Sequence, residues 1–138
     1  MNYDLRTLAG RAELHDLLLS LGRALDERRF ADLNTILTQD ATGATRNGAG
    51  SDRDVLIAQI EAGNKDYARL LHRFSNVLTE VDGDTATIRA YITALSGRAD
   101  SLVPASRRYG LAHIKAVQTP NGWRISELNV EPVFVVEQ

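Results

Sequence analysis

The chain has three histidines and no cysteine, so acid–base or metal chemistry must depend on few side chains. His15, His72 and His113 lie far apart and lack the spacing of a metal site, so we expect no bound metal. His72 follows Leu70-Leu71 and precedes Phe74, which places an imidazole in apolar company. Such a histidine is either a core residue bonded to a backbone carbonyl or a general base that faces a ligand.

Asp26 is the acidic residue whose position on the predicted helix is compatible with a role in a functional site. Apolar residues recur before it at helical spacing: Leu14, Leu18, Leu21 and Leu25. Asp26 lies roughly 100° around the helix from the centre of this stripe, at the edge of the buried face. Gly22, one turn earlier on the same flank, leaves space there. The carboxylate is therefore either a solvated acid at a helix end or a group that a pocket between helix and sheet can reach.

Secondary candidates lie in the second half of the chain. Asn76 is four residues past His72, so it shares a face with it in an unbulged strand and could polarise a carbonyl. His113 lies in a predicted antiparallel strand whose register the sequence leaves open. Tyr91 and Tyr109 could line a pocket or simply pack. Arg107-Arg108 could attract an anionic substrate or form a solvated strand end.

Composition and motifs exclude several classes of function. Sixteen basic and 18 acidic residues are spread along the chain, with a net charge of −2 and no basic patch, so we expect no nucleic-acid partner. The stretch GAGSDR fails the dinucleotide pattern, and the chain has neither a P-loop nor a G-x-S-x-G elbow. We therefore expect no cofactor. The charged N-terminus and the lack of an apolar run of ~20 residues predict a cytoplasmic protein without a membrane partner.

The first half of the chain predicts helices. We expect a long helix from residue 5 to about 28, a short one over 31–37 and a brief strand over 41–45. The glycines of 47–52 indicate an irregular loop. The S-x-x-D pattern that starts at Ser51 is typical of a capping box and predicts a helix to about residue 61.

The second half predicts strands. β-branched and aromatic residues indicate two antiparallel pairs: 74–81 with 85–95, and 107–119 with 123–136. Asp82-Gly83 is a strong hairpin signal between the first two, and Pro120-Asn121-Gly122 separates the second two. Helices followed by a run of antiparallel strands predict an α+β fold, in one domain over residues 1–138.

Four segments carry a resemblance to a known family. They are ALDERRFADL at the end of the first helix, LLHRFSN entering the sheet, VDGDTATIRAY at the hairpin and NGWRISELNV in the last strand. In order and spacing, over about residues 8–131, they resemble the SnoaL-like (nuclear transport factor 2-like) superfamily. The resemblance implies a cone-shaped α+β barrel. In such a barrel the N-terminal helices pack on the concave face of a strongly curved, mixed but mainly antiparallel sheet and enclose a pocket.

The resemblance also implies a catalytic pair. In dehydratase-like members an aspartate near the end of the first helix pairs with a histidine that opens the first long strand. By position these are Asp26 in ALDERRF and His72 in LLHRFSN. Hexachlorocyclohexane dehydrochlorinase is similar in both segments and in a W-K-F-S-K-L-N stretch, which is WRISELN here. Scytalone dehydratase has a tyrosine beside its aspartate and a second histidine on the next strand. Here Leu25 and a strand without histidine argue against that two-histidine arrangement.

The expected function is that of a cofactor-independent lyase or isomerase, of the dehydratase or cyclase kind. Its substrate would be a small, mostly apolar, oxygenated or cyclic compound. His72 is the expected base and Asp26 its orienting partner, with Asn76, Tyr91, Tyr109 and His113 as candidate substrate-binding residues. The alternative is a non-catalytic ligand-binding or dimerisation module, because members of this superfamily also include proteins with no known reaction.

The last strand predicts a homodimer. Several of its apolar residues are consecutive: Val133, Phe134, Val135 and Val136, with Val130 shortly before. Because side chains alternate along a strand, these residues point to both faces of the sheet. We expect a second copy to bury the outer face.

Overall fold

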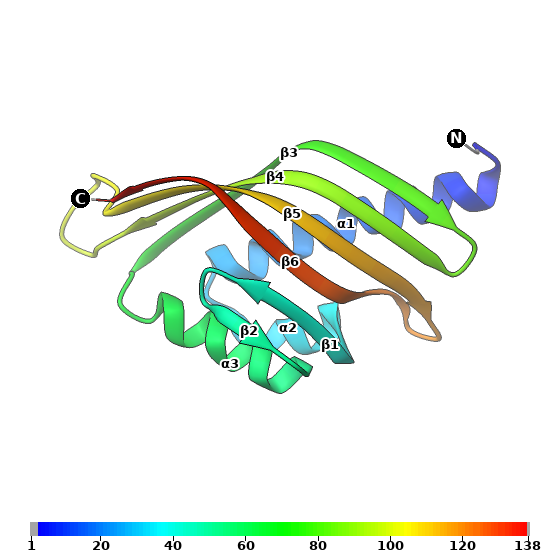
Figure 1. Cartoon of the computed structure of the whole chain (residues 1–138), viewed down its shortest axis with the longest axis horizontal. Coiled ribbons are helices and arrows are strands. Elements are labelled where there is room, and N and C mark those ends of the chain that lie inside the picture. The colour runs from blue at the N-terminus through cyan, green and yellow to red at the C-terminus, as the bar shows by residue number, and fades with distance from the viewer. Residues whose placement is uncertain (1–2, 138) are drawn as a thin grey trace.

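The computed structural model describes residues 3–137. Helices come first and long strands afterwards, as predicted (Figure 1). In chain order the elements are α1 (Leu5–Asp26), η1 (Phe30–Asp32), α2 (Leu33–Ile36), β1 (Leu37–Thr45), β2 (Gly48–Gly50), α3 (Arg53–Asn64), β3 (Arg69–Asp82), β4 (Thr85–Gly97), β5 (Ser106–Thr119) and β6 (Gly122–Glu137).

Six strands form one mixed sheet in the order β2-β1-β6-β5-β4-β3. β1 and β6 run parallel, and every other neighbouring pair is antiparallel. The long strands β3 to β6 arch over α1, and the shorter elements lie below them (Figure 1). The predicted α+β fold, with helices on the concave face of a mainly antiparallel mixed sheet, is confirmed.

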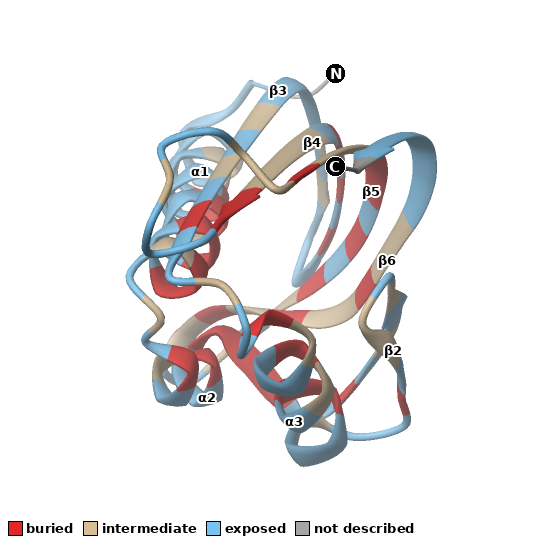
Figure 2. Cartoon of the chain, turned by 90° about the vertical axis from the view of Figure 1, so that its left-hand side faces the viewer, coloured by how far each residue is buried: buried red, intermediate tan, exposed pale blue. Residues whose placement is uncertain are grey.

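The core lies between α1 and the concave face of the sheet. The predicted leucine stripe of α1 is buried, and α1 packs mainly against β3. The strands contribute alternate residues to the same core: Ala86, Ile88, Ala90, Ala112, Ile114 and Ala116. Buried segments therefore line the inside of the curve in Figure 2. The inward residues of the strands recur every second residue, and the leucines of α1 recur at helical spacing. Both sets pack together in one apolar layer.

Three local predictions were wrong in detail. The helix expected over 31–37 consists of the short elements η1 and α2. It ends one residue early, at Ile36, because Leu37 is extended and pairs with Ile125 of β6. The stretch expected as an irregular loop contains β2, whose Gly48 pairs with Thr45 in a tight antiparallel turn. Helix α3 is capped by Asp52 rather than Ser51, since the Asp52 carboxylate accepts a hydrogen bond of 2.9 Å from the backbone N–H of Val55.

The predicted hairpin between β3 and β4 is present, but its turn lies one residue later. Asp82 pairs with Thr85, so Gly83 and Asp84 form the two-residue turn. Gly83 has a φ of 61°, in the left-handed region where glycine is favoured. The glycine of the predicted signal therefore occupies the first position of the turn rather than the second.

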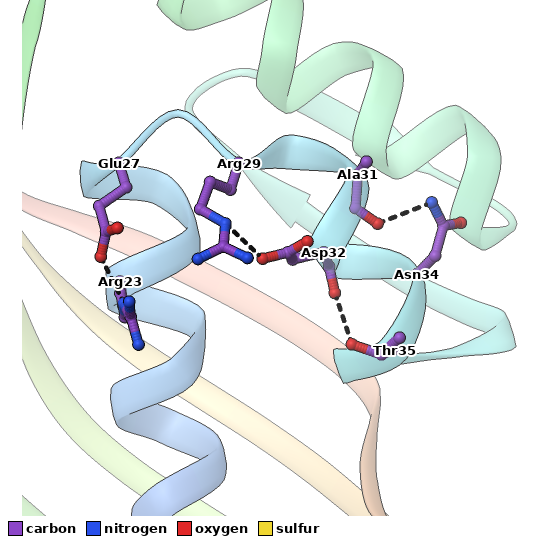
Figure 3. A network of polar contacts seen from close by, with 7 residues as sticks. All are labelled: Arg23, Glu27, Arg29, Ala31, Asp32, Asn34 and Thr35. Carbon is purple, nitrogen blue, oxygen red and sulfur yellow. Dashed lines mark hydrogen bonds and ion pairs between the residues drawn. The ribbon is translucent and has the colours of Figure 1, made fainter.

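A polar network stabilises the corner that follows α1 (Figure 3). Arg28 adopts a φ of 56°, which ends the helix and turns the chain toward η1. Four contacts surround this turn: Arg23 with Glu27, Arg29 with Asp32 at 2.8 Å, Asn34 Nδ2 to the carbonyl of Ala31 at 3.0 Å, and Thr35 Oγ1 to the carbonyl of Asp32 at 2.9 Å. The corner fixes where α1 ends, and therefore where the side chain of Asp26 lies.

Two adjacent leucines on α1 test the contribution of the core. Leu18 is fully buried, whereas the neighbouring Leu19 is exposed. Leu18→Ala should lower the free energy of unfolding by about 2–5 kcal/mol, because it leaves a cavity in the core. Leu19→Ala makes the same chemical change at the surface and should cost less than about 0.5 kcal/mol. Urea unfolding followed by circular dichroism measures both, and equal losses would contradict the described core.

Candidate active site

Asp26 and His72 meet where the end of α1 crosses the start of β3. One carboxylate oxygen, Asp26 Oδ1, accepts a hydrogen bond of 2.8 Å from the backbone N–H of His72. The same oxygen lies 2.8 Å from Nδ1 of the His72 ring. The His72 side chain is 9% exposed and that of Asp26 is 31% exposed. A single oxygen thus holds both the backbone and the ring of the histidine.

This geometry selects one form of the imidazole. An ionised carboxylate only accepts hydrogen bonds, so the proton between the two groups belongs to Nδ1 of His72. The other ring nitrogen, Nε2, then carries a lone pair in the neutral ring. A protonated ring gains a further attraction to the carboxylate. The pair is therefore equipped to take up a proton at Nε2 and to release it.

His72 lines an apolar cavity of about 320 Å³, near the lower end of the ~300–1,000 Å³ usual for small-molecule sites. Apolar side chains from five elements form much of its wall: Leu21 and Leu25 of α1, Ile60 of α3, Phe74 of β3, Ile92 and Ala94 of β4, and Leu128 and Val130 of β6. Polar groups reach it from Asn47, Asn64 and Arg108 as well as from His72. The space suits a small, mostly apolar ligand with a few polar atoms.

Asp26 is not part of that wall. It lines a separate hollow of about 470 Å³, together with the start of β3 and the loop at 101–104. The Asp26–His72 dyad therefore lies between the cavity and this hollow, with the imidazole on the cavity side. A ligand in the cavity meets His72 directly, and Asp26 acts on that ligand only through the histidine.

Comparison with known proteins identifies the family of this chain. A family model described as a SnoaL-like domain matches residues 6–129. The chain belongs to the SnoaL-like family. An uncharacterized protein of Mycobacterium tuberculosis H37Rv, Rv2910c, is 31% identical over 126 residues, which cover 86% of this chain and 82% of that protein.

Solved structures share the SnoaL-like fold at low sequence identity. A candidate scytalone dehydratase of Novosphingobium aromaticivorans superposes with a TM-score of 0.84 at 15% identity, covering 95% of this chain and 89% of that one. A type 2 hexachlorocyclohexane dehydrochlorinase gives a TM-score of 0.80 at 18% identity, covering 95% and 90%. At these identities the likeness is one of fold.

Asn76 lies away from the cavity of this SnoaL-like chain. The register between β3 and β4 shifts between Ser75 and Leu78, and Asn76 adopts a φ of 52° within that bulge. Its side chain is exposed and does not line the cavity. Asn76 would share a face with His72 only in a strand without a bulge. Because β3 has a bulge at this point, that expectation was wrong.

Tyr91, Tyr109 and His113 do not all lie at the cavity. Tyr109 is among the residues that line the cavity. Tyr91 is exposed, and the guanidinium of Arg89 lies 5.5 Å from the centre of its ring. His113 is exposed as well, with Nε2 3.2 Å from a carboxylate oxygen of Glu131. Of these three candidates only Tyr109 lies where a ligand in the cavity can meet it.

Two residues of the cavity wall were missed or set aside by the sequence interpretation. Asn64, at the end of α3, is buried, and its Nδ2 donates 2.8 Å to the carbonyl of Ile60. Its spacing from Leu56, Ile57 and Ile60 on one helical face is a signal that could have identified it. Arg108 also lines the cavity, whereas Arg107 does not. Only the strand register distinguishes these two arginines.

Among the side chains of residues 3–136, no group of three or more histidine, aspartate or glutamate residues is placed to hold a metal ion. In the same range no helix is both long and apolar enough to cross a membrane.

Removal of the carboxylate should release the histidine ring. In wild type we expect His72 to be protonated at Nδ1 and unprotonated at Nε2, because Asp26 accepts from Nδ1. In Asp26→Ala both tautomers should appear, and the backbone amide of His72 should exchange faster with solvent. Two-bond ¹⁵N–¹H spectra in mildly alkaline buffer distinguish the tautomers, with His15 and His113 as internal references. A wild-type ring protonated at Nε2 would contradict the described contact.

Proposed function

We propose that this SnoaL-like protein is a cofactor-independent lyase or isomerase that acts on a small, mostly apolar, oxygenated or cyclic compound. The observation that carries the proposal is the 2.8 Å contact between His72 Nδ1 and Asp26 Oδ1 at the wall of an apolar cavity. A base, an orienting acid and a largely apolar pocket are what removal of a carbon-bound proton requires.

In the proposed reaction His72 is the general base and Asp26 is a positioning residue. Nε2 takes a proton from a carbon of the substrate, and the electron pair of that C–H bond forms a double bond to the neighbouring carbon. In a lyase the leaving group departs from that neighbour with its bonding pair. In an isomerase the neighbouring carbon already has a double bond to a third carbon; the electron pair of that bond moves to the third carbon, which takes the proton. Asp26 holds Nδ1–H throughout and stabilises the imidazolium that forms.

The apolar wall supports this chemistry. Charge interactions are stronger where few water molecules and few dipoles screen them, so the attraction between Asp26 and a protonated His72 has more effect here than at the surface. The names of two structural neighbours, a dehydrochlorinase and a candidate scytalone dehydratase, describe loss of hydrogen chloride and of water. Both are eliminations, which favours a lyase.

A second feature favours assembly of two copies. Residues of three strands form an apolar outer patch, which we define as Leu71, Tyr91 and Val136; all three are exposed. Strand pairing places Leu71 and Val136 in one row across the sheet, through Leu95 and Arg107. Contiguous exposed apolar surface on a sheet is typical of an interface. We propose that a second copy covers the outer patch through a two-fold contact, which applies equally to a catalytic or a binding-only protein.

The catalytic proposal is tested by turnover in D₂O. The wild-type protein is incubated with a panel of cyclic hydroxyketones and halogenated alicyclic compounds, and NMR and mass spectrometry detect deuterium uptake or loss of the leaving group. For a compound that is converted, His72→Ala should lower turnover on the order of 10²-fold or more, as loss of a general base does. Asp26→Asn should cost less, because its oxygen still accepts from Nδ1.

The control for these variants is His15→Ala, which removes an exposed imidazole from α1 and should leave turnover unchanged. Turnover that survives His72→Ala would refute the assignment of the base. Binding without conversion across the panel would favour the ligand-binding module.

The dimer is tested by a charge in the outer patch. Val136 is 46% exposed in the single chain, so Val136→Glu should not disturb folding, but it should place an unpaired charge in the contact between copies. Light scattering at micromolar concentration should give a dimer for wild type and a monomer for Val136→Glu. Val55→Glu, at an exposed apolar residue of α3 away from the sheet, should remain dimeric. A monomeric wild-type protein would end this proposal.

A further inference from the structure

A buried asparagine in the cavity wall has an amide oxygen without a protein partner. Asn64 is 4% exposed and lies one turn after Ile60 on the same face of α3, and both residues line the cavity. Its Nδ2 donates 2.8 Å to the carbonyl of Ile60. Because a carbonyl only accepts, this contact fixes the orientation of the amide. No group in the described part of the chain donates a hydrogen bond to Oδ1 of Asn64.

Hydrogen bonds to the backbone fix the position of Asn64. Its carbonyl accepts 2.8 Å from Nη1 of Arg28 and 3.3 Å from the N–H of Tyr67. Arg28 follows Asp26 by two residues, so the corner that places the carboxylate of the dyad also holds the end of α3. The dyad and the amide of Asn64 are therefore placed on the same cavity by one corner of the chain.

A second carboxamide lies beside the first. Asn47, in the turn between β1 and β2, lines the cavity and packs on Gly63, where an added methyl group would overlap its side chain. The Oδ1 of Asn47 already accepts a hydrogen bond of 3.4 Å from Nη1 of Arg46. Of the two neighbouring carboxamides, Asn64 is therefore the one whose oxygen is left for a ligand.

The unpaired oxygen of Asn64 can select among ligands. Buried polar atoms in proteins nearly all have a hydrogen-bond partner, so an unpaired one calls for a specific explanation. Hydrogen bonds are electrostatically strong in surroundings of low polarity, and an unpaired polar group is correspondingly costly there. A site built on such an acceptor discriminates against ligands that lack the matching donor.

We propose that Oδ1 of Asn64 accepts a hydrogen bond from a hydroxyl group of the ligand, and that the substrate is a small, mostly apolar alcohol. Asn64 is a specificity-determining residue in this arrangement. Because Oδ1 accepts and does not donate, it cannot give a proton to a departing hydroxide. The hydroxyl group that it holds therefore stays on the product, and the group lost in a lyase reaction is a different one. The inference depends on the proposed function, because it names the substrate class of that site.

The test compares cyclohexanol with cyclohexanone, which are nearly equal in size but differ in whether the oxygen carries a hydrogen. Neither undergoes elimination, because the C–H bonds of cyclohexanol are not acidic and cyclohexanone has no leaving group. Isothermal titration gives the affinities, and the ¹³C–¹H signals of the His72 ring report whether each compound enters the cavity. Wild type should bind cyclohexanol on the order of tenfold more tightly, because the buried acceptor is paired in that complex alone.

The two carboxamides of the wall provide a matched pair of variants. Asn64→Leu removes the amide and nearly keeps the volume of the side chain. It should abolish the preference for cyclohexanol while cyclohexanone binds at least as tightly as before, which also shows that the cavity is intact. Asn47→Leu makes the same change at the carboxamide whose oxygen is already paired, and should keep the preference.

A measurement on the wild-type protein does not depend on how a variant folds. A carbonyl carbon is deshielded when its oxygen accepts a hydrogen bond. The ¹³C signal of Cγ of Asn64 should therefore move downfield with cyclohexanol and much less with cyclohexanone. Cγ of Asn47 serves as the internal reference. A bound cyclohexanol that leaves the Asn64 signal in place would refute the proposed contact, whatever the variants do.

The failures of the two proposals have different signatures. If cyclohexanone shifts the His72 signals and binds as tightly as cyclohexanol, or if Asn47→Leu and Asn64→Leu lose the preference alike, the role of Asn64 is refuted while the dyad keeps its proposed function. If neither compound shifts the His72 signals, the cavity does not hold such ligands, and the proposed function fails with the inference.

Discussion

The site depends on one carboxylate oxygen that accepts two hydrogen bonds from the same residue. Asp26 Oδ1 binds both the backbone N–H and the ring Nδ1 of His72. The first contact ties the end of α1 to the start of β3, and the second orients the imidazole. Because both rest on one atom, a displacement of the helix end moves the strand and the ring together. The geometry of the dyad is therefore a property of how α1 packs on the sheet.

That packing in turn depends on how α1 ends. Arg28, two residues after the last residue of α1, has a positive φ that turns the chain away from the helix axis. Its Nη1 donates to the carbonyls of Asn64 and Tyr67 at 2.8 and 2.6 Å. These carbonyls lie at the end of α3 and in the segment that leads into β3. One side chain thus joins the end of α1 to the segment that delivers His72. On the flank of α1 that carries Asp26, Gly22 lets Phe74 approach: a methyl group at Gly22 would lie only 3.2 Å from Cε2 of Phe74. The space that the sequence indicated beside Asp26 is filled by an aromatic ring of the cavity wall.

The parts of this site that follow a simple period could be predicted, and the parts that depend on register could not. The helical period placed Asp26 at the edge of the leucine stripe, and the apolar surroundings of His72 indicated an inward ring. Asn76 was misplaced because the parity of a strand reverses at a bulge, and no residue of the segment SNV signals a bulge before the pairing with β4 is known. Arg107 and Arg108 are chemically identical neighbours, so only the pairing of Arg108 with Ala94 distinguishes the residue at the cavity. β2 was not predicted because its three residues, two of which are glycine, become extended through pairing with β1 rather than through their own preference.

The same strands supply the core at one end and the cavity at the other. Near the 83–84 turn, β4 and β5 present Ile88 and Ile114 to the helix, and these large side chains fill the space between the layers. Farther along, Ile92 and Ala94 of β4 and Arg108 and Gly110 of β5 line the cavity. Gly110 cannot be enlarged without cost, since a methyl group there would lie 2.8 Å from Cγ1 of Val130. Because α1 ends at this level, the cavity opens beside Asp26 and His72, where a helix terminus can present a carboxylate that the uninterrupted leucine stripe could not.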